Sequence, residues 1–178
     1  MPTGHCFMAL SLDGFVARPD HALDWLTKQP TGPEDHGYDA FIAGMDGLVM
    51  GSGSFRTALG FPDWPYAKPV VVLSQTLTPS DIPAALAAKV RISSQTPQAL
   101  MADLDAMGWT RAYVDGGRVI HSFVQAGLVQ DMTLTLIPIL IGQGLRMFGP
   151  LTRDIDLTLT QATPFPSGLV QLRYLVRP

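Results

Sequence analysis

The chain has 178 residues, of which 47% are apolar and 15% are charged, and its formal net charge is −3. This size and composition predict one domain, residues 1–178, that folds around its own hydrophobic core. Without a concentration of basic residues, the sequence predicts no nucleic-acid partner and no binding to an anionic membrane.

The N-terminal segment and the cysteine content indicate the cellular compartment of the protein. MPTGHCFMALSLDG lacks the basic start and the long apolar run of a signal peptide, and the single cysteine, Cys6, has no partner for a disulfide within the chain. The apolar stretch 134–142 is too short to cross a bilayer and is interrupted by Pro138. We therefore expect a cytoplasmic protein.

Strand-like and helix-like segments alternate through the first two thirds of the chain. The expected elements are a strand at 6–12, a helix at 39–45, strands at 47–51 and 70–73, a helix at 96–108 and a strand that begins at residue 111. The 96–108 helix would start at Thr96 as its cap and place Leu100, Leu104 and Met107 on one face. Such alternation predicts a mainly parallel sheet between layers of helices.

The final third is different, because the strand-like segments 131–140, 156–165 and 168–178 follow one another without helices. They should pair antiparallel at one edge of the sheet. Alternation of Leu157 and Leu159 with threonines predicts one buried and one wetter face there. The predicted fold is a three-layer α/β/α sandwich with a mixed sheet, mainly parallel with antiparallel C-terminal strands.

Adjacent glycines, Gly116 and Gly117, stand at a junction of strand and helix in YVDGGRVIHSF, residues 113–123. Glycine costs roughly 0.5–1 kcal/mol of conformational entropy relative to alanine, so its use there needs a reason. A phosphate bound to the first amides of the helix is one reason, and a tight turn with positive φ is another. A second junction of this kind, GSGSFRTAL at 51–59, either binds a second phosphate or is merely a flexible turn. Neither matches a Rossmann loop or a P-loop.

Several motifs resemble the dihydrofolate reductase superfamily, in the branch related to the reductase domain of bacterial riboflavin biosynthesis proteins. They are SLDGFVA (11–17), DWL (24–26), VMGSGSF (49–55) and above all the segment 113–149, which begins YVDGGRVIHSF and ends IGQGLRMFG. The likeness covers nearly the whole chain. It implies a dihydrofolate reductase-like fold, NADPH as cofactor and hydride transfer to a heterocyclic substrate, either a pterin or a ribosylaminopyrimidine. It also implies a homodimer, formed through the region of LIPILIG.

The resemblance also implies which residues bind the cofactor: Gly51, Ser52, Gly53, Ser54, Ser74, Gly116, Gly117, Arg118 and Val119. The family commonly has a basic residue where this chain has Ser52, and often another at Gln75. Because a 2′-phosphate is best recognised by arginine or lysine, NADH is an alternative to NADPH. Arg56, Lys68 and Arg91 are candidates to replace the missing cations.

Reduction of an imine needs a proton donor, and Asp13 and Asp24 are the candidates near the expected nicotinamide end. A catalytic carboxyl needs burial to raise its pKa, which Trp25 beside Asp24 could provide. Alternatively, Asp13 fixes a turn before Gly14, and Asp24 caps a helix.

Trp25 and His36 are the candidate substrate contacts. Asp115 is assigned to turn formation, not catalysis. The histidines have no metal-ligand spacing, so no metal is expected, and Cys6 is assigned to the core. Two other functions stay open, which are nucleotide binding without turnover and a purely structural dimerising domain.

Overall fold

A computed structural model describes residues 1–177. The strands are β1 (Thr3–Ser11), β2 (Phe15–Ala17), β3 (Gly47–Gly51), β4 (Val70–Leu73), β5 (Val90–Ser93), β6 (Arg111–Asp115), β7 (Val129–Ile137), β8 (Leu145–Arg146), β9 (Leu157–Pro164) and β10 (Val170–Val176). The helices are α1 (Asp24–Thr27), α2 (Tyr38–Ala43), α3 (Ser52–Leu59), α4 (Pro97–Ala106) and α5 (Gly117–Gln125), with 3₁₀ turns at Pro79–Asp81 and Ala84–Leu86.

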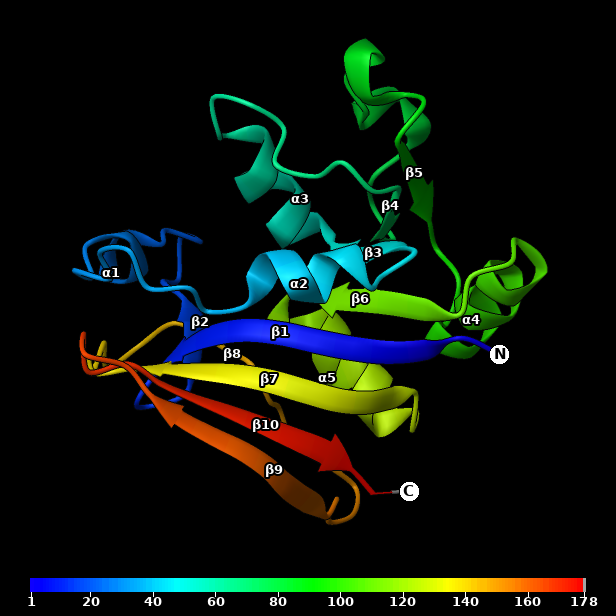
Figure 1. The fold of residues 1–178 in the computed structure, drawn as a ribbon. Helices are drawn as coiled ribbons and strands as arrows, with labels where there is room; N and C mark the ends of the chain where they lie inside the picture. The colour runs from blue at the N-terminus through cyan, green and yellow to red at the C-terminus, as the bar shows by residue number, and fades with distance from the viewer. Residues whose placement is uncertain (178) are drawn as a thin grey trace.

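Eight of the strands form one sheet in the order β5-β4-β3-β6-β1-β7-β10-β9 (Figure 1). Each neighbouring pair from β5 to β7 is parallel, whereas β10 runs antiparallel to both β7 and β9. The predicted mixed sheet with antiparallel C-terminal strands is confirmed. The connections differ accordingly: α3, α4 and α5 follow the parallel strands β3, β5 and β6, whereas no helix lies between β7 and β10, and residues 165–169 join β9 to β10.

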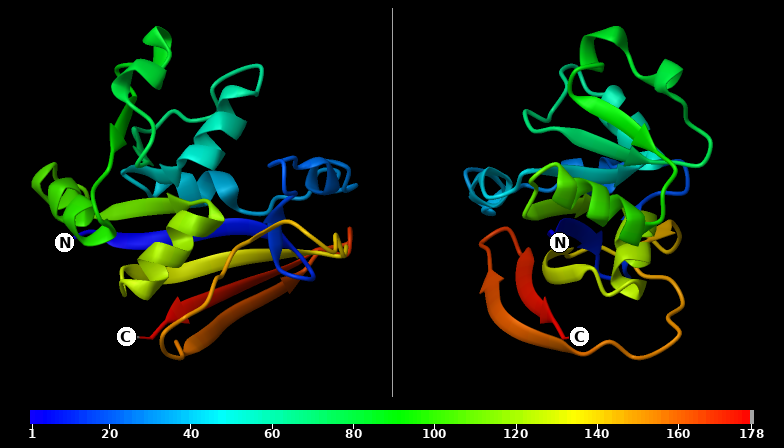
Figure 2. Two further views of the ribbon diagram at one scale, coloured as in Figure 1. Left: turned by 180° about the vertical axis from the view of Figure 1, so that it is seen from behind. Right: turned by 90° about the vertical axis from the view of Figure 1, so that its right-hand side faces the viewer.

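Helices cover both faces of this sheet (Figure 2). On one face, Leu100 and Leu104 of α4 and Phe123 of α5 pack against Cys6 and Met132 of the sheet in one buried cluster. A second buried cluster contains Phe55 of α3 with side chains of β3 and β4, and partly buried residues of α2 pack against it. The predicted three-layer sandwich is therefore confirmed, and Cys6 is a core residue as expected.

Two predictions about side-chain burial are wrong. Met107 is 58% exposed, because α4 ends at Ala106 and the buried face of the helix uses Met101 instead. Leu157 and Leu159 are 41% and 52% exposed, because β9 is the outermost strand and lies beyond the helices that cover the sheet. The capping prediction is confirmed, since the Thr96 hydroxyl accepts a hydrogen bond of 3.3 Å from the backbone N–H of Ala99.

A small second sheet, which the sequence did not predict, pairs β2 with β8 in antiparallel fashion. Phe15 lies opposite Arg146, and Ala17 lies opposite Leu145. This pairing brings a segment near residue 146 next to the loops that follow β1 and β2. Within residues 1–177 no helix combines the length and the apolar character that crossing a membrane requires.

Candidate functional site

A cleft of about 850 Å³ opens at the carboxyl ends of β3, β4 and β6. These three strands are parallel neighbours, so the residues that follow them meet at one edge of the sheet. Its volume lies at the upper end of the range for small-molecule sites, roughly 300–1,000 Å³. Its apolar part includes Val16 of β2, Leu23 just before α1, and Leu145 of β8.

Two helices begin at the cleft. Helix α3 starts directly after β3 with Gly51 as its N-cap, and α5 starts directly after β6 with Gly116 as its N-cap. Neither cap makes a side-chain hydrogen bond to the helix. The first amides of both helices, at Ser52 to Ser54 and at Gly117 to Val119, are therefore not satisfied by a cap and carry the positive end of the helix dipole into the cleft.

The glycines at these junctions have packing reasons as well. Gly116 has a φ of 87°, so the alternative of a positive-φ turn is correct at this residue. A β-carbon on Gly116 would lie 2.6 Å from Oγ of Ser54, and one on Gly117 would lie 2.5 Å from the carbonyl oxygen of Arg146. The bare backbone thus lets the two helix N-termini and β8 approach one another, and this close approach forms the wall of the cleft.

Charge in the cleft differs from charge in the whole chain. The net charge of the protein is −3, yet three arginines and one aspartate line the cleft, namely Arg56, Arg118, Arg146 and Asp115. The guanidinium of Arg146 lies 4.5 Å from the centre of the Phe15 ring, which holds it at the rim through a cation–π contact. An excess of cations beside two helix N-termini suits an anionic ligand.

Asp115 is the buried acid of the site. It ends β6 immediately before Gly116, and its Oδ1 accepts a 3.2 Å hydrogen bond from the Tyr113 hydroxyl. Burial raises the pKa of the Asp115 carboxyl, and hydrogen bonds from Ser54, Tyr113 and the Gly116 backbone act in the opposite direction. Burial and the nearby Asp115 charge also raise the pKa of Tyr38 to about 12. The site therefore contains a carboxyl that holds its proton to a higher pH than an ordinary aspartate.

The surroundings of Asp13 do not favour the predicted role of proton donor. Its carboxylate accepts hydrogen bonds from the Ser11 hydroxyl at 2.6 Å and from the backbone N–H of Gly142 at 2.8 Å, with a weaker pair from Ile141. The Ser11 hydroxyl, followed by these backbone donors, lowers the pKa of Asp13. Asp13 is a carboxylate that ties the turn after β1 to the turn after β7, and it does not line the cleft.

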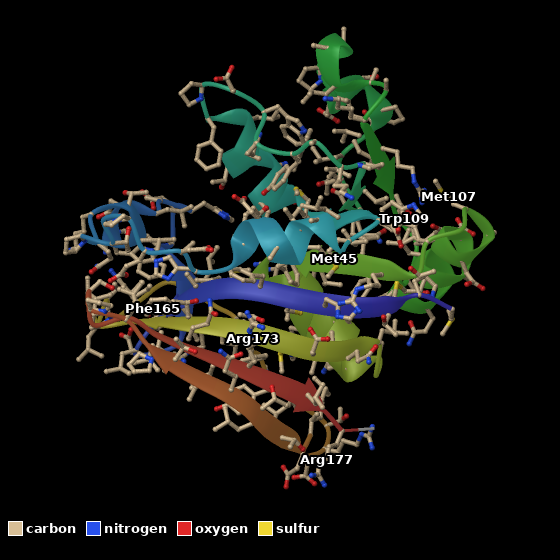
Figure 3. All side chains as sticks on the ribbon, in the orientation of Figure 1. Met45, Met107, Trp109, Phe165, Arg173 and Arg177 are labelled. Atoms are coloured by element: carbon tan, nitrogen blue, oxygen red, sulfur yellow. The ribbon has the colours of Figure 1, made fainter. Side chains whose placement is uncertain are left out.

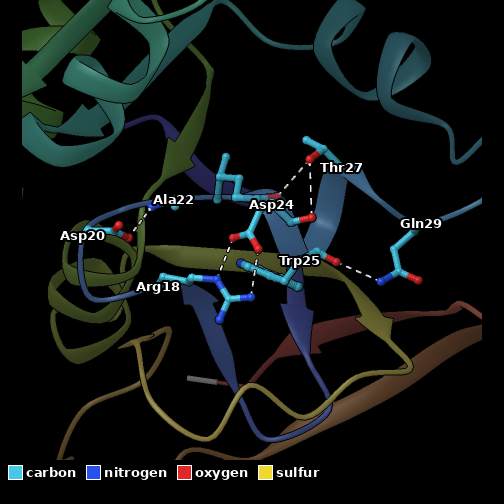
Figure 4. A network of polar contacts seen from close by, with 8 residues as sticks. Arg18, Asp20, Ala22, Asp24, Trp25, Thr27 and Gln29 are labelled. Atoms are coloured by element: carbon cyan, nitrogen blue, oxygen red, sulfur yellow. Dashed lines mark hydrogen bonds and ion pairs between the residues drawn. The ribbon is translucent and has the colours of Figure 1, made fainter.

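The contacts of Asp24 and Trp25 likewise do not favour their predicted roles in catalysis and substrate binding (Figure 4). The Arg18 guanidinium donates to both carboxylate oxygens of Asp24, at 2.6 and 2.9 Å, and this pairing lowers the pKa of Asp24. Asp24 is thus an exposed, ionised partner of Arg18. Trp25 is fully buried among Ile137 and Leu169, so its ring has no surface to offer a substrate and instead anchors α1 to the end of β7.

His36 does not line the cleft either. Its ring packs edge-on against Phe165 at a centroid distance of 4.4 Å, at the end of the sheet where Figure 3 labels Phe165. Nε2 of His36 lies 3.6 Å from a carboxylate oxygen of Glu34, which also accepts hydrogen bonds from Ser167. The prediction of a substrate contact has no support here, because these contacts place His36 where two loops meet.

The predicted cofactor residues come together as a group. All nine line the cleft, namely Gly51, Ser52, Gly53, Ser54, Ser74, Gly116, Gly117, Arg118 and Val119. Of the candidate replacement cations, Arg56 lines the cleft, whereas Lys68 donates to the backbone of Ala43 and Arg91 contacts the sulfur of Met107. The volume, the uncapped helix ends and the arginines fit a dinucleotide with its phosphates.

Sequence reasoning missed three residues of this site. Asp115 was visible as the acid that precedes the glycines, but its burial depends on Tyr113 and on the neighbouring strands. Arg146 reaches the cleft only because β8 pairs with β2. His21 gave no local signal, and it lines the cleft from the loop between β2 and α1. Within residues 1–177, no group of three or more histidine, cysteine or acidic side chains is arranged to hold a metal ion.

Comparisons with known proteins agree with this architecture. A crystal structure of a candidate riboflavin biosynthesis protein from Shewanella sp. PV-4 superposes with a TM-score of 0.92 at 35% identity, over 99% of both chains. The bifunctional diaminohydroxyphosphoribosylaminopyrimidine deaminase and 5-amino-6-(5-phosphoribosylamino)uracil reductase of Thermotoga maritima gives a TM-score of 0.77 at 11% identity, over 99% of this chain and 57% of that one.

A third similar structure is the dihydrofolate reductase of Enterococcus faecalis in complex with NADP(H). It matches with a TM-score of 0.66 at 13% identity, over 99% of this chain and 97% of that one, so the fold is dihydrofolate reductase-like. The family model described as the RibD C-terminal domain matches residues 2–171. The chain therefore belongs to the RibD C-terminal domain family.

Proposed function

We propose that this protein is an NAD(P)H-dependent reductase that transfers a hydride to a pterin or to a ribosylaminopyrimidine of the 5-amino-6-(5-phosphoribosylamino)uracil type. The observation that carries the proposal is the cleft, where two uncapped helix N-termini meet beside three arginines. Two facts about similar proteins support it. The Thermotoga protein is described as a reductase of that uracil compound, and the Enterococcus enzyme is described as a complex with NADP(H).

Some residues of the cleft would bind the cofactor, and others would keep water away from the reacting atoms. The first amides of α3 and α5 would bind the cofactor phosphates, with Arg118 adding charge at the start of α5. When bound, the nicotinamide supplies the hydride. Val16, Leu23 and Leu145 would exclude water from the reacting atoms and hold the two rings against each other.

Asp115 is our candidate for the proton donor. It replaces Asp13 and Asp24, whose carboxyls have lowered pKa values. Burial raises the pKa of Asp115, and the carboxyl lies at the cleft next to the phosphate-binding turn. A positioned acid of this kind contributes about 10²–10⁴-fold to a rate. Asp115 would give a proton to the substrate nitrogen as the hydride reaches the adjacent carbon.

The cofactor preference follows from the arginines. Ser52 carries no charge, and the amide of Gln75 donates to the backbone oxygen of Ser94 at 2.9 Å. Oγ of Ser74 accepts the backbone N–H groups of Thr76 and Leu77. Recognition of a 2′-phosphate would therefore depend on Arg56, the remaining cation on that side. We propose NADPH as the preferred cofactor, with measurable binding of NADH.

An equilibrium titration of the purified protein with NADPH and with NADH tests this function. Nicotinamide emission reports binding, and the Arg56→Gln variant should weaken NADPH binding while affecting NADH little. Micromolar binding of either dinucleotide supports the reductase. If neither binds at millimolar concentration, the cleft serves another ligand, and the proposal fails.

We also propose that the protein forms a homodimer. The predicted interface near LIPILIG is only partly available, because Ile137 is fully buried whereas Leu140 is 69% exposed. Light scattering after size-exclusion chromatography measures the mass directly. A monomer at micromolar concentration would contradict the proposal.

A further inference from the structure

The loop between β2 and α1 is a tight, internally bonded turn (Figure 4). The backbone N–H of His21 donates to the carbonyl of Arg18 at 2.9 Å, and the N–H of Arg18 donates to the carbonyl of Ala22 at 3.1 Å. The carboxylate of Asp20 accepts the N–H of Ala22 at 3.0 Å, and Arg18 also pairs with Asp24. These bonds fix where the side chain of residue 21 points.

His21 occupies a backbone conformation that suits glycine better. Its φ is 69°, and it is the one non-glycine residue with positive φ in the described part of the chain. A β-carbon is strained in this region, whereas glycine adopts it freely. The sequence nevertheless has a histidine here, and the side chain faces the cleft.

The imidazole lies over the start of α3. A β-carbon on Gly53 would be 2.7 Å from Cε1 and 3.0 Å from Nδ1 of the His21 ring, so Gly53 is the residue that makes room for the ring. Within residues 1–177 no hydrogen bond uses either ring nitrogen of His21. The ring thus brings free nitrogens to the uncapped first turn of α3.

We propose that His21 donates a hydrogen bond to the pyrophosphate of the bound dinucleotide at the start of α3. The inference rests on the proposed function, because it assumes that the cleft takes a dinucleotide. It explains why Ser52, at the first position of α3, needs no positive charge: the donor comes from a different loop. An imidazole donates from at least one nitrogen whether neutral or protonated, so the contact does not require a charged ring.

The test compares His21→Gly and His21→Asn with the wild type. Glycine and asparagine both tolerate positive φ, so either variant keeps the turn and removes the imidazole. His121→Asn is the matched control, because His121 accepts a bond from the backbone of Gly149 and does not line the cleft. Calorimetry measures the dissociation constants for NADPH, NADH and inorganic pyrophosphate, and thermal unfolding checks that each variant is folded.

We expect both His21 variants to bind all three ligands about tenfold more weakly, which is the usual size of a lost hydrogen bond to a charged group. The melting temperature of His21→Gly should equal or exceed that of the wild type, because the strain is relieved. Unchanged affinity in a folded variant overturns the inference. A loss confined to NADPH also overturns it, because that result moves the contact to the 2′-phosphate.

The two proposals fail in distinguishable ways. If the wild type binds neither dinucleotide, the proposed function fails, and the contact to a bound dinucleotide fails with it. If the wild type binds them and a folded His21 variant binds them equally well, only the inference about His21 fails. Pyrophosphate binding that His21→Gly loses would support the contact. Absence of pyrophosphate binding to the wild type would refute it.

Discussion

Replacement of Asp115 by asparagine tests whether this carboxyl keeps its proton in the folded protein. The side chains have the same shape, and Oδ1 of asparagine can still accept the hydrogen bond from Tyr113. Asparagine has no charge to desolvate. Since burial raises the pKa of Asp115, the wild type carries a cost of ionisation that the variant does not.

The sign and size of the effect follow from proton linkage. In the unfolded chain the pKa of an aspartate is about 3.9, and in the folded protein the pKa of Asp115 is higher. Between these two values the folded state binds more protons than the unfolded state, so the free energy of unfolding falls as pH rises. Each unit of separation between the two values costs the wild type about 1.4 kcal/mol at neutral pH.

Urea unfolding of the wild type and of Asp115→Asn from pH 4 to pH 8 measures the difference in their free energies of unfolding. The variant should gain stability relative to the wild type as pH rises through the window above pH 4, and its turnover should fall about 10²–10⁴-fold. Asp46→Asn is the control with the opposite sign, because backbone N–H groups of Thr110 and Arg111 lower the pKa of Asp46. Parallel stability curves for Asp115→Asn and the wild type would refute a raised pKa and remove Asp115 as the proton donor.

Three further substitutions test the corrected site. Trp25→Ala should lower the free energy of unfolding by about 3–5 kcal/mol, measured in urea, because the ring is fully buried; a small change would mean that the ring is free for substrate. Asp24→Asn should leave turnover unchanged in a steady-state assay, since it removes only the exposed pair with Arg18; lower turnover would restore Asp24 as a catalytic residue. Gly117→Val should lower the free energy of unfolding by about 1–3 kcal/mol, measured by thermal unfolding, and also weaken NADPH binding, because the added carbons meet the Arg146 carbonyl. Unchanged stability would show that β8 can shift to make room for the side chain.

Local chemistry determined a large part of this protein in advance. Apolar runs with β-branched residues, such as 47–51 and 70–73, became β3 and β4 at the predicted residues. Thr96 capped α4, and the glycines at 51 and 116 became the N-caps of α3 and α5. These features depend on neighbours in the chain, which is why periodicity, capping and glycine placement were sufficient to predict them.

Tertiary structure alone decided which acids and aromatics belong to the site. Asp24 has the same sequence signal whether it lies in an apolar pocket or beside Arg18, and only the fold brings the arginine within 2.6 Å. Trp25 became core and Asp115 became the buried acid for a related reason, because the pKa and exposure of a side chain depend on residues distant in sequence. Arg146 lines the cleft because β2 pairs with β8. Strands this short have no sequence pattern from which their pairing could be predicted.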